Sequence, residues 1–210
     1  FNTKNIIVCA GYKNASSTCT STFNSPKTHD EDFEEFLHNN TDIILIPFNN
    51  DLEQIYKSAY FQDIITQGCP YSFFNQKYGA MKDIPNSNKD YKINIIKNTN
   101  VTKLVNHYKE IKWICENDFR LNNKIRCNNL NKKYNLNLDF NSTQIQCFHV
   151  NIRNKIRKII YFHISNLNTN FENLKHEIYG HSKPDIKLRN TNIGKQKWYK
   201  NKYNEFLNSF

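Results

Sequence analysis

Six cysteines are the residues of this chain with the clearest capacity for chemistry, and four of them form a repeated pattern. Cys9 and Cys19 stand near the start, and Cys115 and Cys127 follow about half a chain later at a similar spacing. In each pair an apolar run precedes the first cysteine and a polar stretch precedes the second. Short-range pairs in small domains favour disulfide formation. We therefore expect one disulfide-stapled unit to be used twice.

The remaining two cysteines, Cys69 and Cys147, have no short-range counterpart. Two arrangements stay open for them: a bridge to each other across the two units, or a bond from one of them to another chain. Cysteine spacing alone does not choose the connectivity. The chain has no CxxC motif and no cysteine–histidine cluster with zinc-finger spacing, so an oxidising compartment fits better than reduced thiols.

Motifs of known enzyme classes are weak in this sequence. His176 and His181 flank a glutamate, but they are five positions apart, whereas two zinc ligands on one helix need a spacing of four. Cys147 and His149 would share one face of a strand, as a nucleophile and its base would, but a structural cystine explains Cys147 better. No GxSxG, P-loop or GxGxxG motif occurs, and five glycines leave little material for a phosphate-binding loop. We expect no catalytic residue, no metal and no cofactor.

Positive charge is concentrated in the last part of the chain. The formal net charge is +10; residues 151–210 contain 12 Lys and Arg against 4 acidic residues, whereas residues 1–150 contain 17 against 15. The candidate binding surface of this region consists of Arg153, Lys155, Arg157, Lys158, Lys195, Lys197, Trp198, Lys200 and Lys202. Such a surface can hold a glycan, nucleic acid, an anionic membrane or an acidic protein. A solvated basic face is the plainer interpretation, and without a nucleic-acid-binding motif nucleic acid is the least favoured partner.

No apolar run approaches the roughly 18 residues that a membrane span needs. The chain begins at Phe1 rather than Met, so we expect a mature or trimmed chain that reaches a membrane only through a partner. Possible glycosylation sequons occur at Asn14, Asn39, Asn100 and Asn141. The 35 asparagines would produce about this number by chance, so the sequons do not argue for secretion.

The elements that must position these residues are mostly strands. Apolar alternation or short apolar runs predict strands at residues 5–10, 41–48, 91–97, 144–152 and 158–164. The segment Ile43 to Ile46 is apolar on both faces, which predicts a central strand, and the last two strands are placed to form a hairpin. Helical spacing predicts helices at residues 30–37, 52–65 and 198–210, and residues 102–115 are compatible with a helix or with a mix of linker and strand.

Three features together resemble the six-cysteine domain family of malaria-parasite surface proteins. They are the Asn-, Lys- and Ile-rich composition, two β-rich halves of about 105 residues, and a short cysteine pair at the start of each half. The resemblance implies disulfide-pinned β-sandwiches, with Cys9 bonded to Cys19 and Cys115 bonded to Cys127. Domains of the family contain further cysteines, including a C-x-C that this chain lacks, so the chain would be a degenerate member.

We therefore expect a mainly β fold of two tandem disulfide-stapled β-sandwich domains, residues 1–104 and 105–210, with a few short helices. The expected function is non-catalytic protein–protein recognition, as a secreted scaffold or adhesin subunit of a parasite host-cell invasion complex. The resemblance implies a membrane-anchored thrombospondin-related protein as partner. It also implies an apical secretory organelle, and then the parasite surface, as location. The alternatives are a secreted polyanion-binding protein that uses the basic C-terminal half, for a glycan or nucleic acid, and a hydrolase built on Cys147.

Overall fold

The chain folds as a mixed α/β protein. The computed structural model describes residues 5–11, 16–28, 33–61, 98–117, 121–181, 185–189 and 197–210, apart from the side chains of Ser16, Ile111, Ile114 and residues 197–199. Two compact units are present, one made of residues 1–52 and 119–191 and the other of residues 53–118 and 192–210. Each unit combines stretches from both halves of the chain, so this division differs from the expected domains at 1–104 and 105–210.

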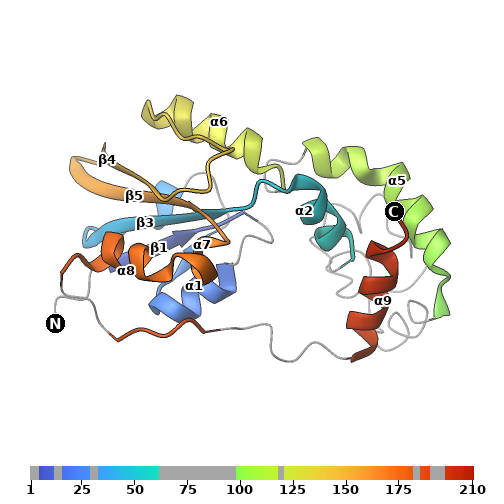
Figure 1. The fold of residues 1–210 in the computed structure, drawn as a ribbon. Coiled ribbons are helices and arrows are strands. Elements are labelled where there is room, and N and C mark those ends of the chain that lie inside the picture. The colour runs from blue at the N-terminus through green and yellow to red at the C-terminus, as the bar shows by residue number, and fades with distance from the viewer. Residues whose placement is uncertain are drawn as a thin grey trace. The chain divides into compact units, whose positions relative to one another are not determined.

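One five-stranded sheet forms the centre of the first unit (Figure 1). The strand order is β2-β1-β3-β5-β4, with bounds Lys27–Thr28 (β2), Asn5–Cys9 (β1), Thr41–Phe48 (β3), Lys155–His163 (β5) and Gln146–Ile152 (β4). Neighbouring strands run parallel except for the β4–β5 pair, which is antiparallel and closes through a turn at Arg153 and Asn154. Positive φ angles at both residues match the tight turn that a two-residue hairpin loop requires.

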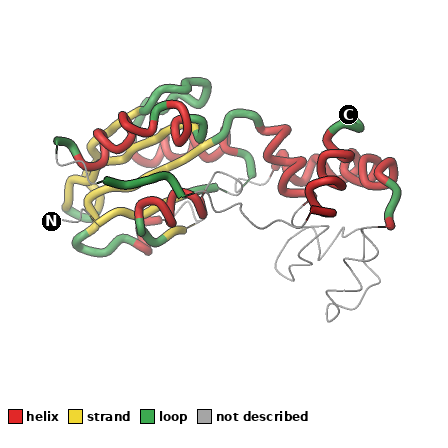
Figure 2. Tube along the Cα trace, turned by 60° about the horizontal axis from the view of Figure 1, so that its bottom comes forward, coloured by secondary structure: helices red, strands yellow, loops and turns green. Residues whose placement is uncertain are grey.

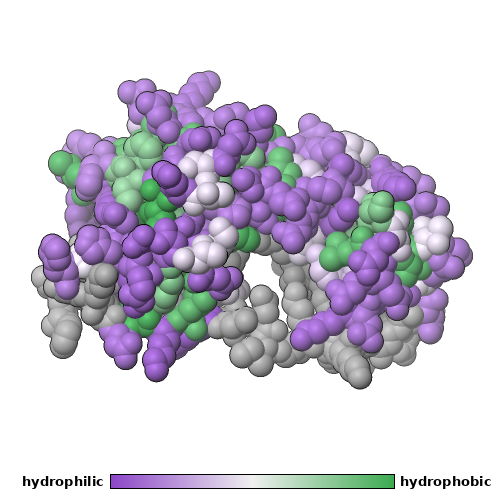
Figure 3. All heavy atoms as spheres, in the orientation of Figure 1, coloured by the Kyte–Doolittle hydropathy of each residue, from purple (hydrophilic) through white to green (hydrophobic). Residues whose placement is uncertain are grey.

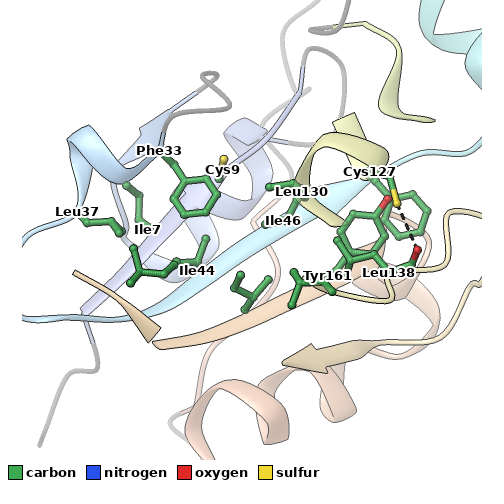
Figure 4. Close-up of a cluster of buried hydrophobic side chains, with 14 residues drawn as sticks. Ile7, Cys9, Phe33, Leu37, Ile44, Ile46, Cys127, Leu130, Leu138 and Tyr161 are labelled. Carbon is green, nitrogen blue, oxygen red and sulfur yellow. Dashed lines mark hydrogen bonds between the residues drawn. The ribbon is translucent and has the colours of Figure 1, made fainter. Parts of the chain in front are cut away.

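Helices cover both faces of this sheet, as the tube in Figure 2 shows. On one face, helices α1 (Ser16–Phe23), α7 (Asn166–Thr169) and α8 (Phe171–Tyr179) pack on residues such as Val8 and Leu45. On the other face, α6 (Asn123–Tyr134) and the 3₁₀ helix η1 (Phe33–Phe36) pack on a second apolar cluster, drawn in Figure 4. The sheet is thus the middle layer of three.

The expectation of a mainly β fold with two β-sandwiches is wrong. A parallel strand cannot return through a tight turn; it needs a crossover, and the crossovers place helices on the sheet. The β3 segment needs cover on both faces of the sheet, because the side chains of Ile43 to Ile46 are buried on both sides. In a sandwich one face of each strand is solvated, and the strand alternates instead.

The predicted disulfides are also wrong: the five cysteines that the structure describes are thiols. Cys9 faces the α6 side of the sheet, whereas Cys19 lies on α1 and packs against the opposite face. The sheet itself therefore separates the two sulfurs. Cys115 and Cys127 belong to different units, and Cys69 lies outside the described residues.

The second unit is helical where it is described. Its helices are α2 (Leu52–Ala59), which starts at the unit's edge, α5 (Val101–Asn117) and α9 (Lys197–Leu207). Buried aromatic rings of Tyr60, Tyr108 and Phe206 hold them together, with centroids 5.4–5.9 Å apart. The Tyr60 hydroxyl donates a 3.0 Å hydrogen bond to the carbonyl of Leu104, so its polar end is satisfied.

Most individual elements follow the sequence prediction. The strands at 5–10, 41–48, 144–152 and 158–164, the hairpin, and the helices at 52–65 and 198–210 are confirmed within a few residues at their ends, as far as they are described. Residues 102–115, for which a helix and a linker–strand mix were both open, are helical. The helix predicted at 30–37 is a single 3₁₀ turn, and the strand predicted at 91–97 lies outside the described residues. Helices α1, α6, α7 and α8 were not predicted.

The surface seen in Figure 3 is mostly hydrophilic, with smaller apolar groups among the polar side chains. Within the described ranges, no helix has the length and apolar character that crossing a membrane demands.

Candidate anion site at the carboxyl ends of β1 and β3

The strand order places a topological switch point between β1 and β3. After β1 the chain crosses to β2 through α1 on one face of the sheet. The chain then crosses from β2 to β3 through η1 on the other face, where α6 also packs. The strand order therefore reverses between β1 and β3, and open α/β sheets bind their ligands at such a reversal, beyond the carboxyl ends of the strands.

Helix α6 brings Arg126 to this edge. The side chain is 3% exposed, and its Nη2 donates to the Cys9 Sγ at 2.8 Å, at the last residue of β1. The other two guanidinium nitrogens, Nε and Nη1, are buried and have no hydrogen-bond partner within the part of the chain that the structure describes. An arginine cannot discharge itself by losing a proton. A buried cation with open donors is costly unless an anion reaches it.

The position of Arg126 is fixed by the start of α6. The Asn122 side chain caps the helix by accepting from the backbone N–H groups of Lys124 and Ile125 at 3.1 and 3.2 Å. One residue later, the buried Asn123 donates its Nδ2 to the carbonyl of Asn49, just beyond β3, at 2.9 Å. This contact ties the amino end of α6 to the carboxyl end of β3.

Helix α1 is the next described element after β1. The buried Gly11 follows β1, and α1 begins at Ser16, so a short link joins the end of β1 to the first turn of α1. The N–H groups in the first turn of a helix have no intrahelical acceptor, and the helix dipole adds partial positive charge there. Helix amino ends therefore attract anions. The guanidinium and the helix end favour the same kind of ligand.

Two described titratable groups near Arg126, Tyr161 and Cys127, do not neutralise it. Burial raises the pKa of Tyr161 and of Cys127, so both stay uncharged near neutral pH. The Cys127 thiol donates to the carbonyl of Leu138 at 3.5 Å, as the dashed line in Figure 4 marks. Among the described residues, no carboxylate lies within ion-pair distance of Arg126.

The basic residues predicted at 153–158 do not gather on one face. Lys155 binds Asp42 at 2.8 Å, and Lys158 binds Glu177 at 2.5 Å. The Arg157 side chain is buried and donates to the carbonyl of Ile152 in the hairpin. Exposed Arg153 lies at the turn.

In the other basic cluster, Lys195 and the side chains of Lys197 and Trp198 lie outside the described residues. Lys200 is exposed on α9, and Lys202 lies 3.9 Å from Glu205. The described members of the two clusters belong to different units.

The surroundings of Cys147 and of the His176–His181 pair do not support catalysis or metal binding. Cys147 donates to Glu177 at 3.2 Å, and burial, with the Glu177 carboxylate, raises the pKa of Cys147 to about 12. A thiol of this kind is a poor nucleophile at neutral pH, which weighs against the hydrolase alternative. The rings of His176 and His181 stand 5.7 Å apart, and no cluster of potential metal ligands occurs among the described residues.

The described sequon asparagines, Asn39, Asn100 and Asn141, are exposed. Asn14 lies outside the described residues. Exposure is compatible with glycosylation, but it is equally ordinary for asparagine at a surface.

Comparison with known proteins identifies no relative: no family model, no curated protein and no solved structure matches this chain. The expected resemblance to six-cysteine domains therefore remains untested.

Sequence reasoning missed Arg126 and the start of α1. A usable signal existed for α1, because an apolar strand ends at Gly11 and a Ser-Ser-Thr helix start follows at residue 16. No comparable signal existed for Arg126. It lies in an Asn- and Lys-rich helix whose single-sequence pattern is polar almost throughout.

Proposed function

We propose that this protein binds a small ligand through a phosphate or sulfate group at the carboxyl ends of β1 and β3. The observation that carries the proposal is the buried guanidinium of Arg126 with two nitrogens that lack partners among the described residues. Its location at the switch point of a parallel sheet supports a ligand site rather than an accident of packing.

The chemistry of the donors selects the class of ligand. A guanidinium presents planar N–H donors that match two oxygens of a phosphate, sulfate or carboxylate at once. We prefer tetrahedral anions because helix amino ends bind phosphate and sulfate, and α1 is the next described element after β1. The remainder of the ligand is not specified by these groups.

The expectation of a secreted adhesin subunit stays a prediction. It depended on disulfide-stapled sandwiches, and those are absent from the described residues. The alternative of a polyanion held by the basic C-terminal half has weaker support than the Arg126 site. Lys155 and Lys158 already bind carboxylates, whereas Arg126 binds none that belongs to the described residues.

The test is thermal unfolding in sulfate or inorganic phosphate, at constant ionic strength set with chloride. We expect both anions to raise the melting temperature of the natural protein in a saturable way. Arg126→Met should remove this effect and should leave the ligand-free protein equally stable or more stable, because it removes a buried charge without an acidic partner. Lys124→Met is the matched control: it removes one positive charge from an exposed position of the same helix.

Two results would count against the proposal. One is an equal response to the anions in Arg126→Met and in the natural protein. The other is a natural protein that responds to sulfate no more than to added chloride.

A further inference from the structure

A hollow of about 390 Å³ lies in the first unit, between the segment that leads into β4 and helix α8. Its volume is within the ~300–1,000 Å³ that is usual for small-molecule sites. Five of its six lining side chains are polar, and Arg126 is not among them: the hollow is lined by Gln144, Ile145, Asn170, Asn173, His176 and Glu177.

Two internal contacts hold the walls of this hollow in place. The buried Asn166, at the start of α7, donates its Nδ2 to the carbonyl of Thr143 at 2.7 Å, directly before the residues that line the hollow. Lys158 on β5 donates to the carbonyl and to the carboxylate of Glu177 on α8, at 2.8 and 2.5 Å. A site whose walls are already fixed loses little conformational freedom when a ligand binds.

The amides of the hollow have no internal partners. The side chains of Gln144, Asn170 and Asn173 form no hydrogen bond with any group of the described ranges. Asn170 is the informative case, because it is half-buried at the amino-terminal cap position of α8, where an asparagine normally accepts from a helix N–H. Here it makes no such bond. The donors and acceptors of these amides are therefore left to solvent or to a ligand.

Glu177 adds a charged acceptor to the amides. Lys158 and Cys147 both donate to its Oε2, whereas its Oε1 forms no hydrogen bond within the part of the chain that the structure describes. The hydrogen bond from Lys158 lowers the pKa of Glu177, so the group is an ionised carboxylate near neutral pH and accepts only. The same lysine compensates its charge.

These groups favour a neutral ligand that both donates and accepts hydrogen bonds. An anion would meet the carboxylate of Glu177, and a cation would have to compete with Lys158 for it. A hydroxyl group can donate to the carboxylate and can also exchange hydrogen bonds with an amide. Ile145, which packs against the apolar core of this face, offers a surface for C–H groups.

We propose that this hollow binds a neutral sugar through its hydroxyl groups. The amides of Gln144, Asn170 and Asn173 surround the ring, and the carboxylate of Glu177 accepts from a hydroxyl. The inference does not depend on the proposed anion site, because it uses none of the groups around Arg126.

The first experiment is an NMR titration of ¹⁵N-labelled protein with glucose, galactose and N-acetylglucosamine. At least one of these sugars should shift the side-chain amide signals of the hollow in a saturable way. Asn173→Ala should weaken that binding roughly threefold to tenfold, as the loss of one hydrogen bond implies. Asn168→Ala is the matched control, because Asn168 is an equally exposed asparagine on α7 that does not line the hollow. No saturable shift with any of the three sugars, or equal affinity of Asn173→Ala and the natural protein, overturns the inference.

A second experiment separates the hollow from the anion site. Arg126→Met should bind the sugar as tightly as the natural protein does, and sulfate should leave the amide signals of the hollow unchanged. Sulfate that saturates these signals in Arg126→Met would show that the ligand class is wrong. Absence of stabilisation by sulfate, with sugar binding intact, overturns the anion site alone; absence of sugar binding, with stabilisation by sulfate intact, overturns the sugar site alone.

Discussion

At the scale of single residues, the first unit contains two buried arginines with contrasting surroundings. Arg157 is 2% exposed, and its guanidinium donates to the carbonyls of the hairpin that it closes, while its Nε is buried without a partner among the described residues. Arg126 is 3% exposed, and it contacts one sulfur and leaves two nitrogens without a partner among the described residues. Burial alone therefore does not indicate a site. Arg126 is distinguished by two open nitrogens, against one in Arg157, and by its position at the carboxyl ends of β1 and β3.

Glu177 provides a residue-scale prediction about pH. A hydrogen bond from Lys158 is the largest cause that lowers the pKa of Glu177, and Cys147 contributes another. A carboxyl group with a lowered folded-state pKa stabilises the fold above its unfolded pKa, and this stabilisation is lost as the pH falls through the folded value. Because the Glu177 side chain is 38% exposed, we expect Glu177→Gln to cost less than about 1 kcal/mol near neutral pH.

Urea unfolding near neutral pH and at about pH 3 checks this prediction. The difference between the natural protein and Glu177→Gln should shrink at the lower pH. Glu35→Gln, at an exposed position of η1, is the control. A constant difference at both pH values would contradict the assigned role of the carboxylate.

At the scale of elements, α6 determines whether the candidate site exists. Its sequence is mostly polar and has no continuous apolar face to pack on the sheet. Among its apolar residues, only Cys127 and Leu130 are buried. Its start and end are therefore important. Asn122 caps the amino end, and Asn135 ends the helix in a left-handed conformation with φ 52°.

Loss of the amino-terminal cap should destabilise the first unit. Asn122→Ala removes the side-chain acceptor of two backbone N–H groups, so we expect a cost of about 1 kcal/mol in the free energy of unfolding. Asn128→Ala, on an exposed position of the same helix, should be neutral or slightly stabilising, because alanine is the better helix former. Urea unfolding of the two variants gives the comparison, and equal stabilities would show that the cap contributes nothing.

The strength of the local hydrophobic pattern explains which elements could be predicted from the sequence. The Ile43 to Ile46 run and the alternation before and after the 153–154 turn are strong local patterns, and they produced β3, β4 and β5. The sequence of α6 is polar and has no clear helical periodicity, so this helix was not predicted. The predicted strands therefore had no predicted helices to cover them. Without those helices a sandwich was the natural arrangement, and the cysteine spacing reinforced it. The Cys9–Arg126 contact joins residues 117 positions apart in the sequence, and a local sequence pattern cannot predict a contact over that separation.

At the scale of the whole molecule, the state of the cysteines distinguishes this fold from the predicted one. Unfolding in denaturant without reductant, followed by alkylation and peptide mass spectrometry, should label Cys9, Cys19, Cys115, Cys127 and Cys147. The sheet stands between the first two, so their spacing in sequence does not bring them together. A cross-linked peptide that contains both Cys9 and Cys19 would contradict the three-layer arrangement.

The pairing of β3 with β5 has a consequence for synthesis on the ribosome. Ile43 lies beside Lys158, so β3 leaves the exit tunnel long before its partner is made. At the usual rate of translation this interval is on the order of ten seconds. During that time a strand with two apolar faces and an open hydrogen-bonding edge has only β1 to pair with. The nascent chain should therefore depend on chaperones until the second half emerges, and expression should improve when translation is fast or chaperone capacity is high.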